Sequence, residues 1–182
     1  MKRFRNIKDR VDILSLDISA SCTGWSAMNY EEEIFMYGTI KTNPKHPTAS
    51  RLDKFRDELK LILSKYKPRE VVIEDTFVGA NPSVTKLLSK FAGVAEQTIF
   101  EYCKIPPYVV SNKSVKAFFK VKDKDALFLV VTDILEWDEN VYTFRKFNDI
   151  VDSIGQLVYC SDEILKSKQF KTEHDYGYRF WF

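Results

Sequence analysis

The sequence predicts an α/β domain with a mixed five-stranded sheet, three antiparallel strands followed by two parallel ones, flanked by helices. Three short apolar segments follow one another at hairpin-like distances near the N-terminus, which is typical of consecutive antiparallel strands. Two amphipathic helical segments then alternate with two further apolar runs, the order expected for parallel strands joined by helical crossovers. Because 182 residues is about the size of one domain, we expect a single domain over residues 1–182, with its core at about 11–165.

The first three strands are expected at residues 11–16, 24–30 and 33–40. The polar stretch NYEEE separates the second strand from the third, and the breaker-rich loop TNPKHPT follows the third. Between the first two strands the chain turns back within LDISASCTG, directly after an aspartate that ends an apolar run.

The next segments alternate between helix and strand. Apolar residues recur every three or four positions from Ser50 to Tyr66, which predicts a helix with one core-facing side. The run EVVIED at 70–75 is continuously apolar up to its acidic end, as expected for a central strand buried on both faces.

The C-terminal half continues this alternation. A second amphipathic helix is predicted over 83–103, and a fifth strand over 106–110, where two prolines confine it to an edge or to the start of a strand. A basic segment from Ser111 to Trp137 has the pattern helix, turn, helix, and a last helix begins near Asn148. We assign no role to the aromatic tail 167–182.

Composition limits the classes of protein that are possible. Hydrophobic residues make up 45% of the chain and charged residues 30%, no apolar run has the roughly 20 residues of a membrane helix, and no signal-peptide pattern is present, so we expect a cytoplasmic protein without membrane contact. Cys22, Cys103 and Cys160 are too widely spaced to suggest a thiolate metal site or a disulfide framework. The net charge of +2 leaves the partner open.

Acidic residues stand where sites form in α/β folds. Asp17 and Glu74 each come directly after an apolar strand, and sites in open α/β sheets lie beyond the carboxyl ends of strands. If the first and fourth strands are parallel neighbours, the two carboxylates lie side by side. Asp75 is a rival to Glu74, but side chains alternate along a strand, so only one of the two can face Asp17.

The last helix adds two more carboxylates, Asp149 and Asp152. Three residues apart on a helix, they project from one face about 5–6 Å from each other. With the helix starting near Asn148, Asp149 falls in the first turn, where the helix dipole favours its ionised form. Four converging carboxylates need counter-charge, and hard oxygen ligands suit Mg²⁺, with Mn²⁺ as a substitute. Two such ions about 3.5–4 Å apart can activate water and stabilise the leaving oxygen of a phosphodiester.

Each acidic residue also has an ordinary explanation. Asp17 can form an Asx-turn with the backbone that follows it, Glu74 can be solvated at a strand end, and a DxxD pair can lie on the polar face of a helix. Only the order and context of the four residues together favour a site.

In these residues the chain resembles the RuvC family of Holliday-junction resolvases, in particular its phage-type members. The resemblance extends from about Ile13 to Cys160 and is carried by LDISASCTG, by VVIEDTF, where a strand-ending glutamate is followed three residues later by phenylalanine, and by the late helical DIVD. It implies an RNase H-like fold and favours Glu74 over Asp75. The metal-binding catalytic residues would then be Asp17, Glu74, Asp149 and Asp152, holding two ions per active site.

One departure from the family affects the turn after the first strand. The usual Asp-Pro-Gly is Asp-Ile-Ser here, so this turn must be built with Ser19 and Ser21 instead of glycine. The segment between the fifth strand and the last helix is also irregular, so a preferred cleavage sequence cannot be carried over.

The resemblance also implies DNA contacts. Phe77 occupies the position at which the family inserts an aromatic side chain at the junction point, although it can equally pack in the core. Lys116 and Lys124 match family lysines near the scissile phosphate, where they would neutralise phosphate charge. They belong to a cationic run that can also be a solvated face, and two lysines of the 83–103 helix can extend it. The full set of candidate lysines is Lys86, Lys90, Lys113, Lys116, Lys120, Lys122 and Lys124.

These observations favour a metal-dependent endonuclease that resolves four-way DNA junctions. A junction has two-fold symmetry, so a homodimer would supply one site for each of two opposed strands, and the resemblance implies the helix 83–103 as its interface. The alternatives are a debranching nuclease of a phage with broader substrates, acting in the host cytoplasm, and a non-catalytic junction-binding module. A sugar-kinase or chaperone-like ATPase also begins with a strand-ending aspartate, but this chain is too short for two nucleotide-binding lobes.

Overall fold

The central sheet has the predicted mixed topology. The computed structural model describes residues 10–29, 34–75, 81–138 and 141–164. The sheet order is β3-β2-β1-β4-β5, in which β1 pairs antiparallel with β2 and parallel with β4, while β2–β3 is antiparallel and β4–β5 parallel. The strands are β1 (Ile13–Asp17), β2 (Cys22–Asn29), β3 (Ile34–Lys41), β4 (Glu70–Glu74) and β5 (Tyr108–Val110). β5 lies at a sheet edge, as its two preceding prolines predicted.

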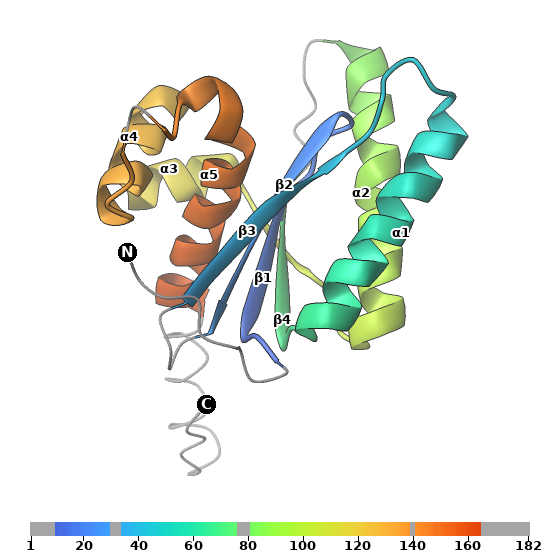
Figure 1. The fold of residues 1–182 in the computed structure, drawn as a ribbon, viewed down its shortest axis with the longest axis horizontal. Coiled ribbons are helices and arrows are strands. Elements are labelled where there is room, and N and C mark those ends of the chain that lie inside the picture. The colour runs from blue at the N-terminus through green and yellow to red at the C-terminus, as the bar shows by residue number, and fades with distance from the viewer. Residues whose placement is uncertain (1–9, 30–33, 76–80, 139–140, 165–182) are drawn as a thin grey trace.

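Helices cover both faces of this sheet (Figure 1). One face carries α1 (Thr48–Tyr66) and α2 (Pro82–Cys103), and the other carries α3 (Asn112–Phe118), α4 (Lys124–Ile134) and α5 (Phe144–Tyr159), followed by a π-helical turn, η1 (Cys160–Ile164). Side chains cap three of the helices: Asn81 accepts from the Ser83 N–H at the start of α2, Ser111 from the Ser114 N–H at α3, and Asp123 from the Ala126 N–H at α4. None of the helices in the described part of the chain is long and apolar enough to cross a membrane.

Two apolar layers hold the helices to the sheet. Under α1 and α2, Phe55 and Phe91 are fully buried and meet edge to face with ring centroids 5.3 Å apart. Under α5, Ile13 and Val72 pack with Ile154 and other buried residues of the helical layer. Because β1 is buried on both faces, a polar residue within it needs a specific partner.

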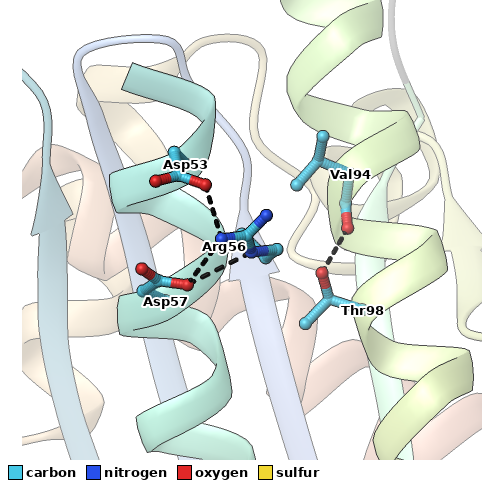
Figure 2. A network of polar contacts seen from close by, with 5 residues as sticks. All are labelled: Asp53, Arg56, Asp57, Val94 and Thr98. Carbon is cyan, nitrogen blue, oxygen red and sulfur yellow. Dashed lines mark hydrogen bonds and ion pairs between the residues drawn. The ribbon is translucent and has the colours of Figure 1, made fainter. Parts of the chain in front are cut away.

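Several polar side chains of α1 and α2 find their partners within their own helix. Figure 2 shows Arg56 reaching Asp53 at 2.5 Å and Asp57 at 3.0 Å on the exposed side of α1. Thr98, which is buried, donates to the Val94 carbonyl one turn earlier in α2 at 2.6 Å. Exposed ion pairs contribute little to stability, so the apolar layers carry this side of the fold.

The start of the last helix corrects one prediction. α5 begins at Phe144 rather than near Asn148, so Asp149 lies in its second turn and the expected effect of the helix dipole on Asp149 is wrong. The physical reason is aromatic packing: Phe144 meets Phe128 of α4 with centroids 5.4 Å apart, and Phe147 meets Trp137 at 5.9 Å. These contacts extend the apolar stripe of α5 toward the N-terminus.

Candidate active site

The turn after β1 places Asp17 at the edge of the sheet. Asp17 is the last residue of β1 and is only 6% exposed. The Ser19 hydroxyl oxygen accepts from the backbone N–H groups of Ser21 and Cys22, at 3.3 and 3.2 Å. Thr23 closes the turn, since its Oγ1 accepts from the Ser19 N–H and donates to the Ser19 carbonyl. The prediction for Ser19 is therefore confirmed, whereas the second side chain of the turn belongs to Thr23, and Ser21 contributes its backbone.

A buried arginine braces this turn from α1. Arg51 is 7% exposed, donates from its guanidinium to the Ala20 carbonyl at 2.6 Å and to Thr42 Oγ1 at 3.2 Å, and lies over the Phe91 ring. Thr42 also donates to the Ala20 carbonyl. Sequence reasoning missed Arg51, because its position on the buried face of a helix gives no signal of a partner 31 residues away.

Three carboxylates meet at the end of β1. Because β1 and β4 are parallel neighbours, Asp17 and Glu74 end their strands side by side, and Asp152 approaches from α5. Burial, a hydrogen bond with Glu74, and the charges of Glu74 and Asp152 together raise the pKa of Asp17 well above its ordinary value. Glu74 is half-buried here, whereas its rival Asp75 is exposed. The predicted meeting of Asp17 and Glu74 is confirmed.

Asp149 lies near this group because α5 packs closely on β2. Gly24, which is paired with Asp17 across the sheet, faces the backbone of α5, and a Cβ at Gly24 would stand 1.9 Å from the Asp149 carbonyl oxygen. Burial raises the pKa of Asp152, Lys124 lowers it, and the charges of Glu74 and Asp149 raise it further. Burial and a hydrogen bond with Asp149 raise the pKa of the Cys22 thiol to about 11. Asp149 thus lies near Asp152 and Cys22, while Asp17, Glu74 and Asp152 are the three carboxylates that meet.

Lys124 supplies counter-charge to the cluster. Its ammonium group forms an ion pair with Asp152, whose side chain is 5% exposed, while the lysine side chain is 45% exposed. Burial alone would lower the pKa of Lys124, but the carboxylates of Asp152, Asp17 and Glu74 outweigh it and raise that pKa. The lysine therefore stays charged and offsets part of the repulsion among the carboxylates.

Two neutral amides also contact Glu74: Asn112 at the start of α3 and Gln156 on α5. Neither was predicted, because their partner lies 38 and 82 residues away in the chain. The only signal in the sequence is a glutamine on the otherwise apolar stripe of the last helix.

The remaining predicted residues are distributed over two helical layers. Lys116 is half-buried on α3, with the exposed Lys113, Lys120 and Lys122 near it in the chain. Lys86 and Lys90 are exposed on α2, which covers the other face of the sheet (Figure 1). Phe77 and the aromatic tail 167–182 lie outside the described residues.

The donor set fits a hard divalent cation. In the described ranges, no three His, Cys, Asp or Glu side chains already stand in ligating geometry. Yet Asp17, Glu74 and Asp152 offer carboxylate oxygens at one edge of the sheet, where Lys124 places a single positive charge beside three carboxylates. Oxygen donors with excess negative charge are the chemistry that Mg²⁺ and Mn²⁺ prefer.

Solved structures share this architecture. RuvC of Thermus thermophilus, determined in complex with a Holliday junction substrate, superposes with a TM-score of 0.70 at 16% identity, covering 85% of this chain and 95% of that one. The yeast mitochondrial Holliday junction resolvase Ydc2 gives a TM-score of 0.53 at 12% identity, covering 91% and 86%. The fold is therefore RNase H-like, as the sequence resemblance implied.

Sequence relatives define the family. A family model described as crossover junction endodeoxyribonuclease RuvC matches residues 13–153. The RuvC of Ehrlichia ruminantium strain Gardel is 32% identical over 160 residues, which cover 81% of this chain and 94% of that protein. The match to the RuvC of Wolbachia pipientis wMel, 36% over 88 residues, spans about half of each protein, 46% of this chain and 54% of the relative. This chain belongs to the RuvC family.

Proposed function

We propose that this protein is a divalent-metal-dependent endonuclease that resolves four-way DNA junctions by hydrolysing two opposed phosphodiester bonds. The observation that carries the proposal is the meeting of Asp17, Glu74 and Asp152 at the carboxyl ends of β1 and β4, in a chain of the RuvC family. Buried like charges are costly, so such a cluster suits a site that gains a cation.

Each carboxylate has a defined part in this proposal. Asp17, Glu74, Asp149 and Asp152 would hold the metal, two Mg²⁺ ions per site, with Mn²⁺ as a substitute. When bound, such ions supply an activated water and stabilise the leaving oxygen of the phosphodiester. The protein's own contribution is the rigid edge formed by two strand ends and α5, which fixes the carboxylates before DNA arrives.

Lysines would hold the DNA. Lys124 stands beside the cluster and Lys116 is on the neighbouring α3, so both can neutralise the phosphate to be cut. Lys113 and Lys120 would extend the phosphate contacts, Lys86 and Lys90 would add contacts from α2, and Phe77 would stack on an unpaired base at the junction point. Such contacts would make binding fall steeply with salt.

The test compares the cleavage of a four-way junction and of plain duplex by the wild-type protein and by a variant that lacks one carboxylate of the cluster. We expect the wild-type protein with Mg²⁺ to cut a four-way junction and to leave plain duplex intact, while Asp152→Asn binds the junction as tightly and does not cut it. Asp57→Asn, which removes an exposed carboxylate on α1, is the matched control and should cut normally.

Other results have definite meanings. Equal cleavage of junctions and Y-forks would identify a broader debranching nuclease. Tight junction binding without cleavage under Mg²⁺ or Mn²⁺ would identify a junction-binding module and contradict the proposal, as would unchanged cleavage by Asp152→Asn.

A further inference from the structure

Both carboxylate oxygens of Glu74 accept hydrogen bonds from side-chain amides. Asn112 Nδ2 donates to Oε1 at 2.9 Å, and Gln156 Nε2 is 3.5 Å from Oε2, a long contact. Gln156 is 3% exposed and lies on the face of α5 that packs against the sheet, among apolar neighbours. An amide in that position would be costly without partners, so its contacts are part of how the core is built.

The Glu74 carboxylate fixes which end of the Gln156 amide faces it, because an ionised carboxylate only accepts hydrogen bonds. Ser15 Oγ, fully buried in β1, donates to Gln156 Oε1 at 3.1 Å. With the amide nitrogen directed at the carboxylate, the carbonyl oxygen of Gln156 is left for the Ser15 hydroxyl. The contacts thus run from β1 through α5 to the end of β4.

The orientation of Asn112 follows from the same logic. Its Nδ2 faces the carboxylate, since the opposite orientation would bring two oxygens together. Asn112, Gln156 and Asp152 also line one small recess with Val115 and Leu127, so the amides and the metal-binding edge adjoin.

Neutral donors suit a carboxylate that must remain available to a cation. A lysine or arginine on Glu74 would neutralise its charge and compete with a metal ion, whereas an amide restricts the orientation of the carboxylate and leaves the negative charge in place. Lys124 already supplies one positive charge, and it pairs with Asp152 rather than Glu74.

We propose that Asn112 and Gln156, with Ser15 behind Gln156, are positioning residues that hold the Glu74 carboxylate in place for the divalent cation. The proposal rests on the proposed function, because it assumes that Glu74 is a metal ligand. A merely structural role for the amides predicts something different: their loss would lower thermal stability and leave metal affinity unchanged.

The experiment measures metal affinity apart from catalysis. Mn²⁺ is titrated by calorimetry into the DNA-free full-length protein, as wild type, Gln156→Met and Asn112→Ala. Methionine keeps most of the volume of Gln156 and removes the donor, and Asn112 is only half-buried, so its variant remains informative if Gln156→Met does not fold. Asp57→Asn is the control, since Asp57 accepts from Arg56 at 3.0 Å on the exposed side of α1, outside the candidate site.

The expected result is a loss of Mn²⁺ affinity in the site variants alone. Each site variant should raise the Mn²⁺ dissociation constant by about 10-fold or more, the effect typical of a lost partner of a metal ligand. On a four-way junction kcat should fall while KM for the DNA stays within about 2-fold of wild type, because Gln156 is buried and the Asn112 amide donates to Glu74. Asp57→Asn should change neither quantity.

The overturning results differ from those for the proposed function. If both site variants bind Mn²⁺ as wild type does, or if wild type binds no Mn²⁺, the positioning role is wrong. If wild type binds Mn²⁺ and cuts no branched DNA, the proposed function fails, while the calorimetry still decides the positioning role.

Discussion

At Asp17, the stability of the fold and the chemistry of the candidate site favour different side chains. A buried strand would be most stable with an apolar last residue, but β1 ends in a carboxylate that has two acidic neighbours and one nearby lysine. Burial first, and then Glu74 and the charge of Asp152, raise the pKa of Asp17. The excess of negative charge lowers the free energy of unfolding, as is common at functional sites.

Removing this charge should stabilise the metal-free protein. We expect Asp17→Asn in EDTA at pH 7.5 to melt about 2–4 °C above wild type, the shift that about 1 kcal/mol produces in a chain of this size. The reason is that asparagine keeps the shape of Asp17 and ends its repulsion with Glu74. Differential scanning calorimetry checks this, and a lower melting temperature for Asp17→Asn would contradict the electrostatic account.

The same carboxyl predicts how stability depends on pH. Because the pKa of Asp17 is raised in the folded state, its contribution is fully present below its unfolded value of about 3.8 and is lost as pH rises through the folded value. Asp152 shifts in the same direction. Metal-free wild type should therefore lose stability relative to Asp17→Asn as pH rises from 4 to 8. Parallel curves for the two proteins would show that Asp17 does not titrate in this way.

The helix α5, which carries the DxxD pair, packs closely on the strands. β2 presents Gly24 where α5 crosses it, so the backbones approach closely beside Asp17. At Gly24 the requirement is space rather than an unusual backbone angle, because any side chain would meet the α5 backbone.

Filling that space should separate the helix from the sheet. We expect Gly24→Ala to destabilise the protein by about 2–3 kcal/mol, since the added Cβ meets a backbone carbonyl that has no alternative rotamer. Urea unfolding measures the change. Gly93→Ala on α2 is the matched control: its Cβ meets nothing within 4 Å, and it should stabilise by about 0.5–1 kcal/mol through helix propensity. Equal effects of the two changes would contradict the packing described for α5.

Much of the element order could be predicted, and the failures have physical causes. Hydrophobic periodicity predicted the five strands and their helices, and the crossover through α1 placed β4 beside β1. The start of α5 was misplaced because Phe144 and Phe147 belong to its apolar stripe but were not counted with it. Arg51, Asn112 and Gln156 could not be paired with partners, because local patterns carry no information on contacts 31 to 82 residues apart.

At the scale of the whole molecule, a small net charge is compatible with DNA binding because cationic residues are grouped. The chain carries only +2 overall, yet five lysines lie between residues 113 and 124, and the last of them, Lys124, pairs with Asp152. The two-fold symmetry of a four-way junction also suggests a homodimer with two-fold symmetry. On α2, Phe100 is 56% exposed on the side of the helix opposite the buried Phe91, Ala95 and Thr98, and we propose this side of α2 as the homodimer interface.

A charge on α2 should therefore separate the protomers. We expect wild type to sediment as a dimer and Phe100→Asp as a monomer, and the monomer to nick one strand of a junction without the paired second cut. Leu61→Asp on α1, where Leu61 is 69% exposed, should remain dimeric. Monomeric wild type that still makes paired cuts, or dimeric Phe100→Asp, would contradict this interface.

We propose that the carboxylates at the ends of β1 and β4 form a metal-dependent nuclease site. The most direct measurement is cleavage of a labelled synthetic four-way junction by wild type and Glu74→Gln, each in EDTA, Mg²⁺ and Mn²⁺. We expect symmetric paired nicks by wild type with either metal, none in EDTA, and none by Glu74→Gln under any condition. Cleavage by wild type in EDTA, or undiminished cleavage by Glu74→Gln, would contradict it.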